Sequence, residues 1–156
     1  MTVTYRLATA DDSAAIHGLL VENATNDGGT IRGSVETLRR YGFERGLFRA
    51  VLAEEAGRAV GLVLVLPEYS SWRGRVGLLV QDLYVAPRMR GRGLGRALLA
   101  EAMRACPDWE PAFLTLLVQH KNKGAQAFYA AQGFTLREEA DMLVCEGAAL
   151  QRLCGA

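Results

Sequence analysis

The chain has 156 residues, the size of one ordinary domain, and we expect a single domain over residues 1–156. Half of its residues are hydrophobic and 22% are charged, which excludes a disordered or collagen-like chain. Eighteen basic and 17 acidic residues leave a net charge of +1, so no global field favours nucleic-acid or membrane partners. The sequence contains no apolar run of membrane-spanning length and no signal-peptide pattern, so we expect a cytoplasmic protein.

Cysteine and histidine are rare in the chain. The three cysteines are Cys106, Cys145 and Cys154, and the two histidines are His17 and His120. Their spacing matches no zinc or iron motif, so we expect no metal site. An odd number of cysteines without a secretory signal indicates reduced thiols.

The first half of the chain predicts two helices among three strands. Thr9 can cap a helix whose apolar spacing continues to Asn23, where a polar loop begins. Ser34 can cap a second helix that Gly42 or Gly46 ends. The predicted elements are, in order, a strand at 3–8, a helix from 9, a loop at 23–33, a helix from 34, and strands at 48–53 and 59–66.

The second half alternates strands with helices. A loop at 67–74 leads to a strand at 75–85, and Pro107 ends the helix that follows. The remaining predicted elements are, in order, a helix at 92–105, a strand at 112–118, a helix at 123–132 and a closing pair of strands at 134–137 and 142–145. This order predicts an α/β fold with a central mixed, mostly antiparallel sheet and helices on both faces.

One segment carries the clearest chemical signal. The strand that ends at Val85 leads into a glycine-rich turn over residues 88–96, which opens directly into a helix. Glycines let the backbone approach a ligand, and a helix start offers unpaired N–H groups and a positive dipole end. The four arginines of the turn are Arg88, Arg90, Arg92 and Arg96. The pattern therefore predicts a phosphate or pyrophosphate site.

Two common phosphate motifs fit this segment poorly. No Gly-Lys-Ser/Thr follows the glycines, as a P-loop requires. The glycine spacing is G-x-G-x-G at mid-chain, whereas the dinucleotide fingerprint is G-x-G-x-x-G early in a βαβ unit.

The spacing Arg90-x-x-Gly93-x-Gly95 resembles the acetyl-coenzyme A loop of the GNAT superfamily of N-acetyltransferases. A second signature of that superfamily follows the next predicted strand, with Asn122, Phe128-Tyr129 and Gly133-Phe134. Four stretches look most like the diamine (spermidine/spermine) acetyltransferase branch, namely residues 6–20, 38–43, 68–75 and 81–85. The resemblance implies a sheet whose fourth and fifth strands splay apart to admit the pantetheine arm, and it implies a homodimer.

The resemblance also implies the site residues. Tyr129 matches the general acid, and Gln81 stands at a position that contacts the acceptor. The acceptor-binding positions are Asn26, Asp27, Trp72 and Gln81. The positions implied for acetyl-coenzyme A are Leu83, Tyr84 and Val85 for pantetheine, Arg90, Gly91, Arg92, Gly93, Leu94, Gly95 and Arg96 for the pyrophosphate, and Asn122, Lys123, Gly124 and Ala125 further along the arm.

Two positions depart from the branch. Gln81 replaces a glutamate, and Gly124 replaces a proline. Because few acids accompany Asp27, we expect a mono-amine, an amino acid or a compact diamine to be preferred over a polyamine. Three candidates remain for the catalytic base. They are Asp82, His120 and a water molecule that Gln81 would hold. The Asp82 side chain should face away from that of Gln81 unless a bulge re-aims it.

The expected function is transfer of acetyl from acetyl-coenzyme A to a primary amine of a small molecule by direct attack, with Tyr129 protonating the leaving thiolate. One alternative is a protein N-terminal or lysine acetyltransferase, which needs an open groove that the bulky loop at 68–75 would tend to close. A second alternative is a coenzyme A-binding sensor without transferase activity. Retention of Tyr129 and of a full pyrophosphate loop argues against the sensor.

Overall fold

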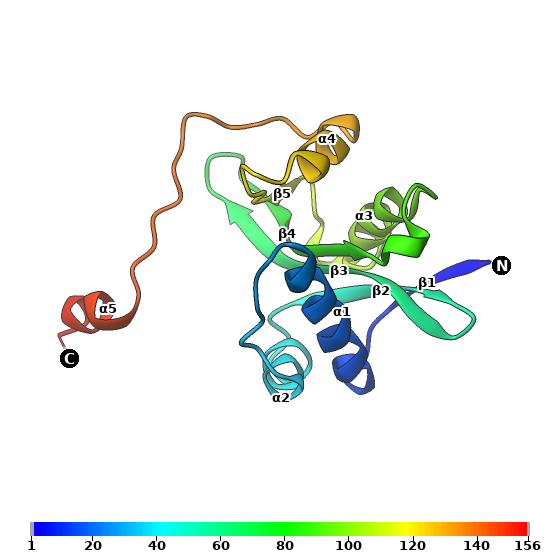
Figure 1. Ribbon diagram of the computed structural model, residues 1–156. Coiled ribbons are helices and arrows are strands. Elements are labelled where there is room, and N and C mark those ends of the chain that lie inside the picture. The colour runs from blue at the N-terminus through cyan, green and yellow to red at the C-terminus, as the bar shows by residue number, and fades with distance from the viewer. Residues whose placement is uncertain (1, 156) are drawn as a thin grey trace. The chain divides into compact units, whose positions relative to one another are not determined.

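The computed structural model describes residues 2–155, which belong to two compact units, Met1–Asn122 and Lys123–Ala156 (Figure 1). The first unit contains, in order, β1 (Val3–Leu7), the short helix η1 (Ala10–Asp12), α1 (Ser13–Asn26), α2 (Val35–Leu38), the π-helical η2 (Arg39–Glu44), β2 (Arg49–Glu55), β3 (Arg58–Ser70), β4 (Arg75–Val85), η3 (Pro87–Met89), α3 (Leu94–Arg104), η4 (Pro107–Trp109) and β5 (Leu114–Leu116). The second unit contains α4 (Lys123–Ala131) and α5 (Gly147–Leu153). None of the helices in the described part is long and apolar enough to cross a membrane.

The five strands form one mixed sheet in the order β1-β2-β3-β4-β5. The first four pair antiparallel, and β5 pairs parallel to β4. This confirms the mixed, mostly antiparallel sheet that the sequence predicts. The pairing with β5 covers only Leu78–Val80 of β4, which continues to Val85. The two strands therefore part after Val80, and the edge of β4 from Gln81 to Val85 lies beyond the last residue paired with β5.

A β-bulge lies at the point where the two strands part. Leu64 pairs with Asp82, but the next residue, Val65, pairs with Val80, so that Gln81 is the extra residue of β4. Because side chains alternate along a strand, an extra residue exchanges the faces toward which the following side chains point.

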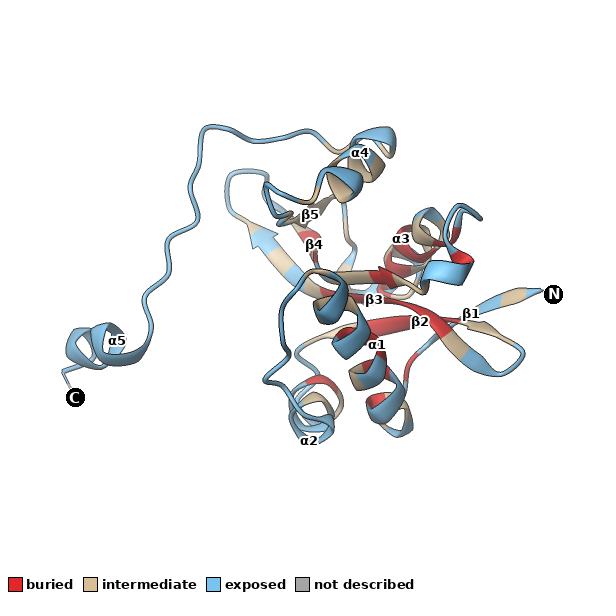
Figure 2. Cartoon of the chain, viewed as in Figure 1, coloured by how far each residue is buried: buried red, intermediate tan, exposed pale blue. Residues whose placement is uncertain are grey.

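The core fills both faces of the sheet. On one face, α1 packs through Ile16, Leu19 and Leu20 against a cluster that includes Leu62 and Tyr84. On the other face lies α3, whose Leu98 would be 3.1 Å from a Cβ added at Gly61, the strand neighbour of Leu62. Figure 2 shows the buried positions concentrated in β2, β3 and β4 and on the inner sides of these helices.

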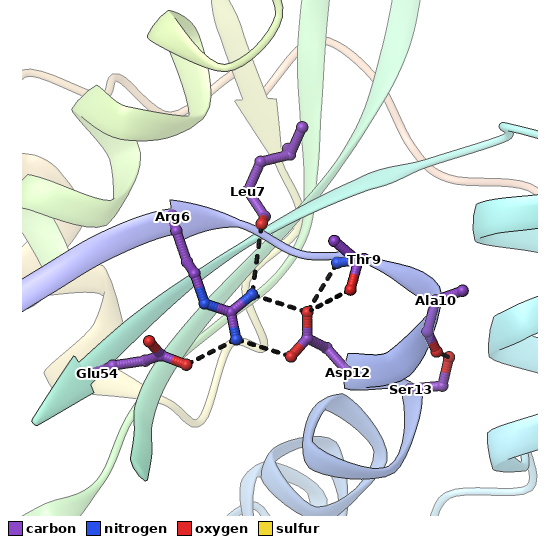
Figure 3. Close-up of polar contacts among 7 residues, drawn as sticks. All are labelled: Arg6, Leu7, Thr9, Ala10, Asp12, Ser13 and Glu54. Carbon is purple, nitrogen blue, oxygen red and sulfur yellow. Dashed lines mark hydrogen bonds and ion pairs between the residues drawn. The ribbon is translucent and has the colours of Figure 1, made fainter. Parts of the chain in front are cut away.

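A polar clasp fixes the start of α1 (Figure 3). The Arg6 guanidinium forms two hydrogen bonds with the Asp12 carboxylate, at 2.8 and 2.7 Å, and a third with Glu54 of β2 at 2.7 Å. The Thr9 N–H donates to Asp12 at 2.7 Å. The Arg6 hydrogen bonds hold the pKa of Asp12 at about 2, although burial opposes the shift. The clasp therefore ties β1, β2 and the first turn of the helical segment together.

Several element boundaries differ from the sequence prediction. The first helix continues to Asn26, so Asn23 lies on the helix rather than at the start of a loop. Strand β3 continues through Pro67 to Ser70, because its pairing with β2 ends at Val65 and proline is tolerated on an unpaired edge. Helix α3 begins at Leu94, two residues later than expected, and β5 contains only Leu114–Leu116.

The predicted closing strands at 134–137 and 142–145 are wrong for the structure described here. Residues 134–146 contain no helix or strand, and α5 follows them. A strand exists only with a hydrogen-bonded neighbour, and in the described part of the chain no strand pairs with this segment. Leu136, Met142, Leu143 and Val144 are therefore exposed.

Candidate active site

The glycine-rich turn forms an open cradle at the start of α3. Gly91 and Gly93 have φ angles of +74° and +80°, and Gly93 is the N-cap of the helix. The first intrahelical bond joins the Ala97 N–H to the Gly93 carbonyl at 3.1 Å, so the N–H groups of residues 94–96 have no acceptor within the helix. A Cβ added at Gly91 or Gly93 would meet no atom within 4 Å. The residues present therefore fit a pyrophosphate, which needs converging N–H donors and open space.

The arginines of the turn have different partners. Arg88 and Arg92 both form ion pairs with Glu55, at 3.0 and 3.3 Å. Burial raises the pKa of Glu55, but the two arginines outweigh this effect and leave that pKa below its usual value. Arg90 Nε donates to the Val85 carbonyl at 2.9 Å. Arg96 is exposed and has no hydrogen bond or ion pair among the described residues. Two of the four positive charges are thus partly neutralised within the protein.

The last residues of β4 present both backbone and side-chain groups. Beyond the bulge, Asp82 and Tyr84 share the face that α1 covers, because their partners on β3 are Leu64 and Leu62. Tyr84 is 3% exposed, and its hydroxyl donates to the Glu22 carboxylate at 2.8 Å. Burial raises the pKa of Tyr84, and the Glu22 carboxylate raises it further.

The Asp82 carboxyl is half-buried beside α1. Burial raises its pKa, and a hydrogen bond with Asn23 opposes the shift. The bulge at Gln81 therefore re-aims Asp82 toward α1, which is the exception that the sequence analysis left open. A carboxylate with a raised pKa is a stronger base than an exposed one.

The last turn of α1 touches both sides of the split between β4 and β5. Asn23 contacts Asp82, and Asn26 contacts Tyr84, on the β4 side. On the β5 side, Asp27 Oδ1 lies 3.5 Å from Asn122 Nδ2, in the turn that follows the strand. The turn is closed by a hydrogen bond from the Asn122 N–H to the carbonyl of residue 119, at 2.9 Å. One helical turn thus lines the mouth of the split.

The structure brings together Asn26, Asp27 and Asn122 with the end of β4, as a common site requires. Trp72, in contrast, lies in the turn between β3 and β4 and is 99% exposed. His120 is exposed in the turn after β5.

Three polar residues of this region escaped the sequence analysis as site candidates. They are Asn23, Glu55 and Lys121, whereas Glu22 was already expected near Asp27. Only Asn23 had a local signal, the continuation of the first helix to Asn26; Glu55 ends β2 and Lys121 lies in the turn after β5, so their places depend on tertiary structure.

The second unit holds Tyr129 on α4. Its ring packs edge-to-face against Phe128 and Phe134, with ring centroids 5.1 and 5.3 Å apart. The Phe134 N–H donates to the Tyr129 carbonyl at 3.0 Å, just after Gly133, whose φ is +91°. The motif that the sequence analysis singled out therefore forms one helix end with its own aromatic cluster. Lys123, Gly124 and Ala125 form the first turn of the same helix.

Comparison with known proteins gives consistent matches. The sequence pattern described as the acetyltransferase (GNAT) family matches residues 21–134. Thialysine N-epsilon-acetyltransferase of Bos taurus is 32% identical over 134 residues, with 78% of each chain covered. An integron cassette protein from the mobile metagenome of V. cholerae has a TM-score of 0.81 at 20% identity, with coverage of 100% and 99%. A predicted acetyltransferase from Clostridium acetobutylicum, solved with acetyl-CoA, has a TM-score of 0.76 at 16% identity, with coverage of 92% and 96%. At these identities the two structures show likeness of fold.

Proposed function

The chain belongs to the acetyltransferase (GNAT) family and is an acetyl-coenzyme A-dependent N-acetyltransferase, and we propose that its acceptor is the terminal primary amine of a lysine-like amino acid. The observation that carries this proposal is the line of polar groups along the last turn of α1. Beside this turn lie the Glu22 and Asp82 carboxylates on the β4 side of the split, and Asp27 and Lys121 on the β5 side. The thialysine acetyltransferase relatives support an acceptor of this class.

We propose that the cradle at the start of α3 binds the pyrophosphate of acetyl-coenzyme A, which supplies an activated thioester when it is bound. The backbone N–H groups of Gly93 to Arg96 and the exposed Arg96 side chain would hold the phosphates. The edge of β4 from Leu83 to Val85, where β5 does not pair and, among the described residues, only the Val85 carbonyl is already taken by Arg90, would hold the pantetheine arm through main-chain hydrogen bonds. The residues of α4 that carry the second signature, Lys123 to Ala125, complete the proposed cofactor contacts.

The acceptor amine must lose a proton before it attacks the thioester. With a pKa of about 10.4, less than about 0.1% of an alkylamine is neutral at pH 7. We propose that Asp82 accepts this proton, directly or through a water held by Gln81. The support is the position of Asp82 next to the bulge and the raised pKa that burial gives it. Tyr129 is proposed to return a proton to the leaving thiolate, on the strength of the family signature that contains it.

We further propose a homodimer. The apolar residues of the segment between α4 and α5 are exposed, with Leu143 at 92% and Met142 at 68%. A second copy of the chain would cover such a segment. Light scattering coupled to size exclusion checks the assembly, and a monomer at micromolar concentration would contradict it.

A panel of amines tests the proposed function. Thiol release from acetyl-coenzyme A is measured with thialysine, lysine, a short diamine, spermine and a lysine-containing peptide. We expect the fastest release with the free amino acids. If only the lysine-containing peptide caused thiol release, the protein would be a protein acetyltransferase. If acetyl-coenzyme A bound but none of the amines caused thiol release, the protein would be a sensor.

A further inference from the structure

Two opposite charges lie side by side where α1 meets the turn after β5. Lys121 Nζ donates to the main-chain carbonyl of Asp27 at 3.3 Å, and Asn122 approaches the Asp27 carboxylate. Within the described residues, the Lys121 ammonium and the Asp27 carboxylate form no ion pair with each other. An ammonium has three N–H donors and a carboxylate about four acceptor positions. Both groups therefore retain hydrogen-bonding capacity for a ligand.

This pair lies one turn of α1 away from the contact that the helix makes with β4. Asn23 contacts Asp82, the neighbour of the bulge residue Gln81. Asp27 follows Asn23 by four residues, which an α-helix converts into about 6 Å along its axis. The end of α1 that carries Asp27 thus lies one helical turn beyond the residue that contacts Asp82.

A lysine-like amino acid matches this arrangement in length and in charge. About five single bonds separate its terminal nitrogen from its α-carbon, which corresponds to about 6 Å in an extended chain. The α-carbon carries an ammonium and a carboxylate on adjacent positions. With the terminal amine beside Asp82, the two charged groups of the α-carbon reach the end of α1.

We propose that Asp27 binds the α-ammonium and Lys121 binds the α-carboxylate of the acceptor. Lys121 is then the residue that distinguishes an amino acid from a diamine, since a diamine has no group for it to bind. Asp27, by contrast, serves both classes of acceptor. This inference rests on the proposed function, because it names the residues that would bind the α-ammonium and α-carboxylate of an amino-acid acceptor.

The test compares two acceptors that differ only in the carboxylate. They are thialysine and bis(2-aminoethyl) sulfide, which keeps both amines and the thioether. For Lys121→Met we expect kcat/KM to fall about tenfold with thialysine, equivalent to about 1.4 kcal/mol. With the sulfide diamine we expect a change of less than about twofold, which also shows that the variant is folded. Lys121→Glu should raise kcat/KM for the diamine.

A matched control is Arg104→Met, which removes an exposed cation whose partner is Glu101 on the same helix. It should leave both substrates unaffected. An equal loss with both acceptors, or no loss with thialysine, for Lys121→Met would overturn the assignment of Lys121 while leaving the proposed function standing. If the wild-type protein turned over neither acceptor, the proposed acceptor class would itself be wrong, and this inference would fall with it.

Discussion

Gln81 occupies the position where one added residue changes the chemistry of β4. With regular pairing, Asp82 would face away from α1, because Val80 and Asp82 would share a face with Val65. The bulge places Asp82 on the α1 face instead, where burial raises its pKa. The sequence analysis left Asp82 open as a base only if a bulge re-aimed it, because strand alternation gives no signal for a bulge. The structure supplies that bulge, so Asp82 joins Asp27 near the proposed acceptor, while the Glu22 carboxylate accepts a hydrogen bond from the Tyr84 hydroxyl.

The first prediction for a single residue concerns Tyr129. Tyr129→Phe keeps the ring that packs against Phe128 and Phe134 and removes only the hydroxyl. We expect kcat to fall about 100-fold, the size of one general-acid contribution, with little change in cofactor affinity. Steady-state kinetics with calorimetry measures both. Tyr69→Phe, at an exposed tyrosine of β3, is the control, and turnover within a factor of two for Tyr129→Phe would assign Tyr129 to packing alone.

The second prediction concerns Gly93. A valine at this position would place its side chain in the open cradle and adopt a positive φ at a strain of about 1–3 kcal/mol. We expect coenzyme A affinity to fall at least about tenfold in calorimetry. Gly46→Val is the matched control, because Gly46 has a φ of +64° in a turn outside the cradle, with no atom within 4 Å of its Cβ position. Unchanged affinity in Gly93→Val would remove the cradle from the cofactor site.

The candidate site differs most from the sequence prediction at the last turn of α1. The polar run after Asn23 contains glycine and asparagine, which favour loops, so propensity ended the helix one turn early. In the structure the turn is supported by tertiary contacts from Asn23 and Asn26 to β4 and from Asp27 to Asn122. Such long-range contacts cannot be deduced from local sequence. In contrast, the strand–loop–helix order around Gly93 depends on local signals and was predicted within two residues.

The clasp between β1, β2 and η1 gives a prediction about stability. The pKa of Asp12 is lowered to about 2 in the folded protein from about 3.8, so the ionised form stabilises the fold above about pH 4. This stabilisation is lost as the pH falls toward 2. After allowance for solvent screening at Arg6, we expect about 1 kcal/mol of unfolding free energy to be lost between pH 5 and pH 2.5.

Urea unfolding across this pH range measures the effect. The Asp12→Asn variant should show a smaller pH dependence than the wild type by about that amount, because it has no carboxyl to protonate. Glu54→Gln, which keeps the Arg6–Asp12 contacts, should retain most of the dependence. Identical pH dependence in the wild type and Asp12→Asn would show that the clasp contributes nothing to stability.

At the scale of the whole molecule, the order of elements was sufficient to predict the mixed sheet, because turn and helix signals separate the strands of the first 122 residues. The closing strands failed because the continuous apolar run at 142–145 forms a strand only where a neighbour exists to pair with it. A net charge of +1 says nothing about the acceptor. The acceptor preference instead depends on which charges the fold gathers around the split.

The central claim is that this fold acetylates the terminal amine of a small amino acid rather than a polyamine. The most direct measurement is the ratio of kcat/KM for thialysine to that for spermine, in the wild type and in Gln81→Glu. We predict a ratio above about ten in the wild type, since each surplus ammonium without a carboxylate costs about 1–3 kcal/mol. Gln81→Glu should lower the ratio by adding a carboxylate at the bulge. A wild-type protein that prefers spermine tenfold would contradict the account.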